Sequence, residues 1–404
     1  MEEGRPGRMP QMDSLRALAA FCVVEYHGVG IFGTAVTSGG WFKPILGRFD
    51  FGLPVFLLIS AFLLYRPFVR AHMRGEQMPS TAAYAWRRFL RIVPPFWVAL
   101  IVAAIVVPLS YVLTLHGFFT YFGFAQIYSQ HTIGLGDSPA WTLGLEASFY
   151  AFLPFWAVFM RRLPLRGGER SVMRAELAGI SLLVVASLAY KAAMFAAHNV
   201  PLYQHPTPEL TTLPGYMDEL GFGMALAVMS VWIESHPLPR VLRPLDRFPS
   251  LAWMVALAAF LTAAYGIGLH SGPPQLYTPR EYMTREILYG IIAASVMLPI
   301  LVGNPHRGRL RRFLANRTLI WLGTISYGVY LWHWTIMLEF SKWQVAFHSP
   351  FWQRYLIWGT VPILLAIVFG AMSWYLVERP AMSLRRFVRE RRRPVATPAV
   401  EPAP

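Results

Sequence analysis

The sequence is poor in charged residues, in lysine and in cysteine. Only 14% of its 404 residues are Asp, Glu, Lys or Arg, and only three of its 36 basic residues are lysines. Hydrophobic residues make up 55% of the chain. A soluble enzyme needs more charge to cover its surface, and disordered or fibrous chains are not this apolar. The composition therefore excludes these classes and indicates a polytopic membrane protein.

The sequence has no cysteine framework for disulfides, and we expect no cleavable leader. The single cysteine, Cys22, cannot form an intramolecular disulfide or a cysteine metal cluster. The first apolar stretch, from Leu15, is long and lacks a small-residue cleavage site, so we expect it to remain in the mature protein. The net charge of +15 does not indicate nucleic-acid binding, because no folded polar domain that reads a groove is visible.

Apolar windows of about twenty residues predict an all-α fold, a membrane bundle of about ten transmembrane helices over residues 1–380. The shorter aromatic stretch 115–130 indicates an interfacial or re-entrant segment. We expect 381–404, which is basic and proline-rich, to be a disordered tail that contacts anionic lipid headgroups. The predicted spans are 15–33, 49–69, 92–113, 141–160, 176–197, 213–234, 251–269, 286–303, 319–340 and 355–377.

The basic residues cluster in alternate segments between these spans. With the N-terminus inside, the inner segments hold 28 Lys and Arg residues and the outer segments hold 6. Because inner loops are enriched in basic residues, we expect both termini in the cytoplasm.

Ionisable side chains inside membrane spans are costly and are candidates for function. His27 and His333 lie about 20 and 21 Å from the inner ends of their spans, and Glu146 about 8 Å from the outer end of its span. All three therefore reach the outer half of a core about 30 Å thick. Each of them could instead simply bond a neighbouring helix. They share no short ligand spacing, so no metal site is predicted.

A second candidate group lies on the predicted cytoplasmic side. Arg88 and Arg91 stand at the mouth of the span 92–113 with i,i+3 spacing, which places them on one helix face. Guanidinium forks suit the bidentate capture of phosphate. Arg16 lies too deep in its span for a simple membrane anchor. The alternative to phosphate binding is that these arginines only anchor the helix ends at the cytoplasmic surface of the membrane.

Six motifs in order carry a resemblance to a known family. They bracket residues 12–380, and together they resemble the integral-membrane acyltransferase type 3 family. The motifs are Asp13–Ala20 with Glu25-Tyr26-His27, Phe51-Gly52 with Ile59–Leu63, Arg87–Pro94, Trp141–Glu146 with Phe149-Tyr150, Gly323–His333, and Val377–Pro380. The sequence departs from the family pattern at Ala61, Ala147 and Thr335.

The resemblance implies a bacterial cytoplasmic-membrane enzyme that moves an acyl group, often acetyl, from cytoplasmic acyl-CoA to a hydroxyl. Acceptors in the family include cell-envelope glycans, lipid-linked sugars and macrolide-like small molecules. The resemblance also implies that His27 is catalytic and that Arg16, Arg88 and Arg91 bind the donor. We assign Glu146 to catalysis as well, and the motif residues Ser60, Trp141 and His333 to substrate binding.

The chemistry fits a transfer without a protein nucleophile. A hydroxyl is a poor nucleophile at neutral pH and gains from a general base, which a neutral membrane histidine such as His27 can be. We expect Glu146 to lie close enough to orient His27, directly or through water. If it does not, His333 becomes the next candidate partner. Direct transfer and an acyl-histidine intermediate both remain open.

Two other classes of function compete with this interpretation. A proton-coupled secondary transporter would use His27 and the buried acids as a proton relay. Transporters usually have repeated halves, however, and the polar motifs here are not paired between halves. A non-catalytic scaffold would not need polar groups at depth.

Overall fold

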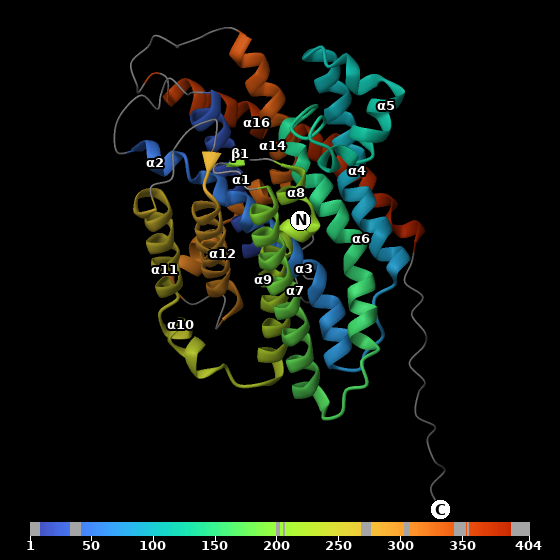
Figure 1. The fold of residues 1–404 in the computed structure, drawn as a ribbon, viewed down its shortest axis with the longest axis vertical. Helices are drawn as coiled ribbons and strands as arrows, with labels where there is room; N and C mark the ends of the chain where they lie inside the picture. The colour runs from blue at the N-terminus through green and yellow to red at the C-terminus, as the bar shows by residue number, and fades with distance from the viewer. Residues whose placement is uncertain are drawn as a thin grey trace, which may run out of the picture.

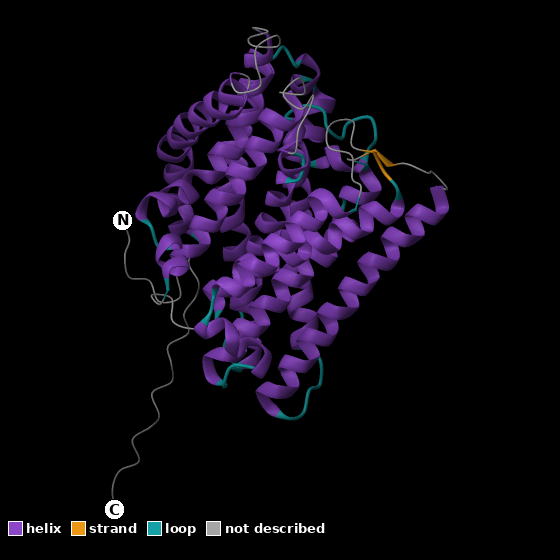
Figure 2. Ribbon diagram, turned by 90° about the vertical axis from the view of Figure 1, so that its left-hand side faces the viewer, coloured by secondary structure: helices purple, strands orange, loops and turns teal. Residues whose placement is uncertain are grey.

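In the part of the chain that the structure describes, the regular secondary structure is helical apart from one short pair of strands (Figure 2). The computed structural model describes residues 9–32, 42–198, 203–204, 207–267, 276–302, 308–342, 353 and 355–388. Within them, β1 (Tyr203–Gln204) pairs antiparallel with β2 (Leu276–Tyr277). The predicted all-α fold class is confirmed.

Every predicted span contains a helix. The long helices are α1 (Pro10–Glu25), continued by the π-helix η1 (Tyr26–Phe32), α3 (Gly52–Met73), α4 (Thr81–Val106), α6 (Trp141–Arg161), α7 (Gly168–His198), α9 (Leu213–Ser235), α11 (Ser250–Leu261) with η9 (Thr262–Gly266), α12 (Pro279–Leu301), α14 (Arg317–Lys342), and α16 (Val361–Ser373) between η10 (Leu356–Thr360) and η11 (Trp374–Glu378). Shorter helices connect them: α2 (Phe42–Leu46), η3 (Phe49–Phe51), η7 (Ser138–Ala140), α8 (Pro208–Thr211), η8 (Arg240–Leu242), α10 (Arg243–Arg247) and α13 (Arg309–Leu314).

Among the described residues, seven helices are long and apolar enough to cross a membrane. An eighth qualifies if Arg240–Arg247 and Ser250–Gly266, which are bent by 101°, form one span. The chain is therefore a multi-pass membrane protein, whereas the count of about ten and the cytoplasmic termini remain predictions. The helices α1 and α14 are not among the seven, and both carry the polar residues of the site described below.

The helices α1, α3 and α14 form the part of the bundle that holds the site. Helix α1 packs against both α3 and α14, α14 packs against α16, and α3 packs against α9. On the far side of α9 from α4 and α6, helices α11 and α12 run side by side (Figure 1). A Cβ atom on Gly323 of α14 would lie 1.7 Å from the carbonyl oxygen of Asp13. The backbones of α1 and α14 therefore touch, and a glycine is required there.

Where the structure describes them, two predicted segments contain only short helices. The stretch 115–130 contains only the short helices α5 (Leu115–Gly117), η5 (Phe118–Phe122) and η6 (Ala125–Tyr128), preceded by η4 (Ser110–Leu113). Beyond the predicted domain boundary at 380 the chain stays helical through α17 (Arg379–Ser383) and η12 (Leu384–Phe387). The indole Nε1 of Trp86 donates to the Leu384 carbonyl at 3.2 Å. Residues 389–404 of the predicted tail lie outside the described residues.

Candidate functional site

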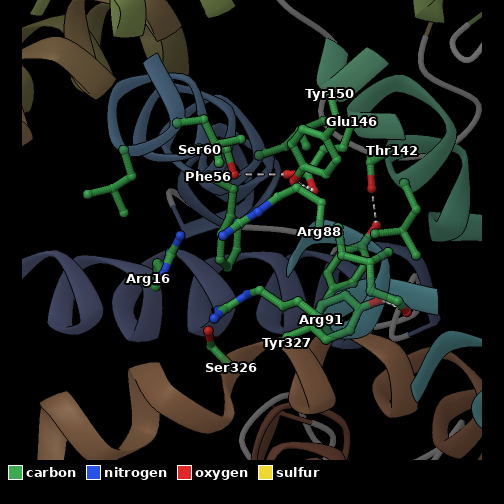
Figure 3. A pocket seen from close by; sticks show the side chains of 16 residues that line it. Arg16, Phe56, Ser60, Arg88, Arg91, Thr142, Glu146, Tyr150, Ser326 and Tyr327 are labelled. Carbon is green, nitrogen blue, oxygen red and sulfur yellow. Dashed lines mark hydrogen bonds between the residues drawn. The ribbon is translucent and has the colours of Figure 1, made fainter. Parts of the chain in front are cut away.

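A cavity of about 250 Å³ opens between α1, α3, α4, α6 and α14 (Figure 3). Five of the eight predicted site residues line it, namely Arg16, Ser60, Arg88, Arg91 and Glu146. These residues come from four helices that are distant in sequence, so the fold brings together most of what the motifs indicated. The remaining wall comprises Leu53, Phe56, Leu63, Leu64, Ile92, Thr142, Leu143, Tyr150, Ser326, Tyr327 and Tyr330.

The cavity is rich in positive charge. The guanidinium groups of Arg16, Arg88 and Arg91 point toward the same space (Figure 3). Arg16 has an acidic neighbour in Asp13, 3.5 Å from its Nη1. The buried Nε of Arg88 has no hydrogen-bond partner among the described residues. Three guanidinium groups face one carboxyl group in the wall, so the cavity has a surplus of donors for an anion.

Helix α4 explains how two arginines reach this depth. It begins at Thr81, where the side chain of Ser80 accepts a hydrogen bond from the amide of Ala83, rather than at residue 92. Arg88 and Arg91 therefore lie about 10 and 15 Å along the helix, and both line the cavity. Their i,i+3 spacing turns both side chains to the cavity, as the sequence predicts.

Glu146 is held in the opposite wall by two hydroxyl groups. Ser60 Oγ donates to its Oε1 at 3.2 Å, and Tyr150 Oη donates to its Oε2 at 2.5 Å. Tyr150 is not among the site residues predicted from the sequence. Its position four residues after Glu146 in α6 was a usable signal, because residues with i,i+4 spacing are neighbours on a helix.

His27 and His333 form a pair beside the cavity. Their Nδ1 and Nε2 atoms are 2.9 Å apart, and their ring centroids are 5.0 Å apart. His27 lies in η1, and such π-helical segments are frequent at functional sites. Gly28 lets η1 approach η10 closely, since a Cβ there would lie 2.5 Å from the Trp358 carbonyl oxygen. His333 is completely buried.

The predicted contact between Glu146 and His27 is not among the hydrogen bonds of the described residues. Glu146 bonds Ser60 and Tyr150, whereas His27 bonds His333. The histidines do not line the cavity, but Tyr330, one turn before His333, does. Similar depth along helix axes does not determine which way each side chain points.

Tyr330 joins the cavity wall to the histidine pair. Its hydroxyl donates to the Pro139 carbonyl at 2.5 Å and lies 2.6 Å from Thr142 Oγ1. Ser326, Tyr330 and His333 have i,i+4 and i,i+3 spacing, so they follow one face of α14 over about 10 Å. Trp141, predicted to bind substrate, does not line this cavity and packs 5.7 Å from the ring of Tyr216.

Five other ionisable residues, which lie in or next to predicted spans, form an ionic cluster elsewhere. Lys191 Nζ lies 2.9 Å from Asp218 Oδ2 and 3.4 Å from Glu286 Oε2. Arg285 Nη2 lies 3.2 Å from Asp50 Oδ2. We call these five residues the ionic cluster. Among the described residues, no group of three or more His, Cys, Asp or Glu side chains is placed to hold a metal ion.

Comparison with known proteins gives a family match over most of the chain. The family described as "Acyltransferase domain" matches residues 9–377. "Acyltransferase MdmB" of Streptomyces mycarofaciens is 26% identical, over 98% of this chain and 97% of that protein. "Peptidoglycan O-acetyltransferase OatA" of Listeria monocytogenes is 24% identical, over 81% of this chain and 49% of that protein.

Some of these similar proteins are much longer than this chain. "Putative peptidoglycan O-acetyltransferase YrhL" of Bacillus subtilis is 25% identical over 92% of this chain, and the match spans only 54% of that protein. The chain thus spans about half the length of YrhL and OatA. No solved structure matches the chain.

Proposed function

This chain belongs to the integral-membrane acyltransferase type 3 family and is an acyl-transferring enzyme of the bacterial cell membrane, and from that premise we propose its substrates and its base. The donor is an acyl-CoA, in the first place acetyl-CoA. The acceptor is the hydroxyl of a glycan, a lipid-linked sugar or a macrolide-like small molecule. His27 is the general base.

The observation that carries the donor assignment is the convergence of Arg16, Arg88 and Arg91 in one cavity. Coenzyme A carries phosphates at one end of a slender pantetheine arm and the thioester at the other end. Guanidinium groups bind phosphate, and one of these donors, Arg88 Nε, has no partner among the described residues.

The length of the site supports the same donor. Arg16 and His27 are eleven residues apart on the continuous helix formed by α1 and η1, which is about 16 Å. A long arm spans that separation, and a compact acyl phosphate does not. The cavity of about 250 Å³ is smaller than pockets for whole ligands, which measure about 300–1,000 Å³, so it takes the arm and the phosphates next to it and leaves the adenosine outside.

In the proposed reaction, the acceptor oxygen attacks the thioester carbonyl carbon and gives its proton to His27. The new C–O bond forms, the C–S bond of the tetrahedral intermediate breaks, and the departing sulfur takes the proton back from His27. The products are an ester and free coenzyme A. Glu146, with Ser60 and Tyr150, supplies hydrogen-bonding groups along the arm, whose amides need partners in a buried channel.

The test is acyl transfer from radiolabelled acetyl-CoA in membrane vesicles, with peptidoglycan fragments, a polysaccharide and a macrolide as acceptors. His27→Ala should abolish transfer, whereas Glu234→Gln, which lies outside the cavity wall, should leave it unchanged. Wild-type turnover in His27→Ala would refute the base assignment. Vesicles of the wild-type protein that consume no acetyl-CoA but accumulate a solute with protons would favour the transporter.

A further inference from the structure

A chain of two hydrogen bonds runs from the backbone of α14 to His27. His333 Nδ1 lies 2.5 Å from the carbonyl oxygen of Tyr330, one turn earlier in α14. His333 Nε2 lies 2.9 Å from His27 Nδ1. The two imidazole rings are close to parallel, with an angle of 25° between their planes. Both nitrogens of the buried His333 ring are therefore engaged.

The chemistry of these atoms assigns the protons. A carbonyl oxygen can only accept, so His333 Nδ1 carries a hydrogen. A neutral imidazole has one N–H, which leaves a lone pair on His333 Nε2. That lone pair accepts from His27 Nδ1, so Nδ1 of His27 carries its hydrogen. The lone pair of neutral His27 is then on Nε2, the atom that points away from His333.

We propose that His333 is a positioning residue that fixes the tautomer and the orientation of His27, so that His27 Nε2 is the nitrogen that takes the acceptor proton. This inference rests on the proposed role of His27 as the base. In many hydrolases a carboxylate orients the catalytic histidine. Here a second, neutral histidine does so, and its own tautomer is set by the Tyr330 carbonyl.

The hydrogen bonds between Tyr330, His333 and His27 have two consequences for the proposed transfer. The hydrogen bond from His27 Nδ1 persists after Nε2 is protonated, so the positive charge that forms on His27 faces the lone pair of His333 throughout the transfer. Tyr330 supplies the carbonyl, and its side chain also lines the cavity and is tied to Pro139 and Thr142. The residue that sets the tautomer therefore also forms the wall next to the arm of the donor.

Two polar substitutions at residue 333 separate the two hydrogen bonds. The amide of glutamine reaches the position of Nε2, so His333→Gln can still accept from His27. The amide of asparagine reaches only the position of Nδ1, so His333→Asn can bond the Tyr330 carbonyl but not His27. We expect kcat to fall about 10²- to 10³-fold in His333→Asn and within about tenfold in His333→Gln, with the KM for acetyl-CoA unchanged in both.

The contrast between these variants keeps the test independent of folding. Thermal unfolding and detergent gel filtration report whether each variant folds, and both amides have the same polarity. Equal kcat losses in the two variants, or a loss expressed in KM alone, would overturn the positioning role. Active His333→Asn beside inactive His27→Ala would refute this inference alone. Full activity of His27→Ala would instead refute the proposed base.

Discussion

The bundle buries charge in two regions that are built differently. In the ionic cluster, Lys191 lies within 3.4 Å of two carboxylates, and Arg285 lies 3.2 Å from a third. In the cavity, three guanidinium groups have two neighbouring carboxyl groups among the described residues, that of Glu146 in the wall and that of Asp13, 3.5 Å from Arg16. Buried charges are costly unless they are paired. The ionic cluster contains its own counterions, whereas the cavity leaves positive charge for a ligand to neutralise.

One buried acid beside the ionic cluster differs from its five members. Glu219, adjacent to Asp218 in α9, is almost fully buried, and neither of its carboxyl oxygens has a hydrogen-bond partner among the described residues. The pairing in the ionic cluster therefore concerns its five members and does not extend to every acid beside them. The difference still predicts opposite responses to the removal of one cation.

The largest effect is expected from Lys191→Met. Breaking a buried pair leaves Asp218 and Glu286 without this cation, which costs about 3–5 kcal/mol of folding stability. Arg91→Met is the matched variant in the cavity, and it should keep the unfolding temperature while losing acyl transfer. Thermal unfolding in detergent measures both. Similar unfolding temperatures for the two variants would contradict the claim that the ionic cluster, and not the cavity, stabilises the fold.

A smaller effect is expected when a cavity arginine is replaced by lysine, which keeps the positive charge but lacks the planar guanidinium group. Arg88→Lys and Arg91→Lys should each raise the KM for acetyl-CoA about tenfold, because an ammonium cannot reproduce a bidentate contact with phosphate. The KM for the acceptor and the unfolding temperature should stay the same. Steady-state kinetics with each substrate varied in turn provides the measurement, and an unchanged donor KM would return these arginines to membrane anchoring.

Glu146→Gln should shift the charge of the cavity in the opposite direction. Among the described wall residues it removes the one carboxyl, while keeping an amide that can bond Ser60 and Tyr150. Because the positive surplus grows, we expect the KM for acetyl-CoA to fall about threefold, and kcat to fall with it as free coenzyme A leaves more slowly. A large loss of kcat at unchanged KM would instead support the direct catalytic role that the sequence suggests.

The smallest effect is expected at a more exposed ion pair. Glu234 pairs with Arg66 and Arg74, and its side chain is 28% exposed. Pairs of this kind contribute about 0.5 kcal/mol, so Glu234→Gln should move the unfolding temperature little and leave turnover unchanged. A loss of folding stability as large as that of Lys191→Met would show that this more exposed ion pair contributes as much as the buried pairs. Burial would then not explain the stability that the ionic cluster provides.

The sequence predicts the helices and most of the cavity because both depend on local spacing. Apolar windows locate each long helix, and i,i+3 spacing places Arg88 and Arg91 on one face. The same helical spacing in α6 and α14 also predicts Tyr150 and Tyr330 as site residues. The start of α4 was missed because its first turns, from Thr81, are too polar for an apolar window.

The partner of His27 could not be predicted with the same arithmetic. Glu146 and His333 were both at a suitable depth, and the choice between them depends on how α6 and α14 are rotated about their axes. That rotation is set by packing between helices, and one short backbone contact, between Gly323 and Asp13, is invisible in composition and periodicity. A single sequence therefore supplied the candidates but not their pairing.

The contact between Gly323 and Asp13 also limits how this enzyme can vary. Arg16 lies three residues beyond Asp13 in α1 and Ser326 three residues beyond Gly323 in α14, while His27 and His333 lie on the same two helices further along. The arginine end and the histidine end of the site thus depend on the same backbone contact, at which Gly323 has no side chain. A side chain at Gly323 would push α1 away from α14, so it should disturb the arginine end and the histidine end of the site together.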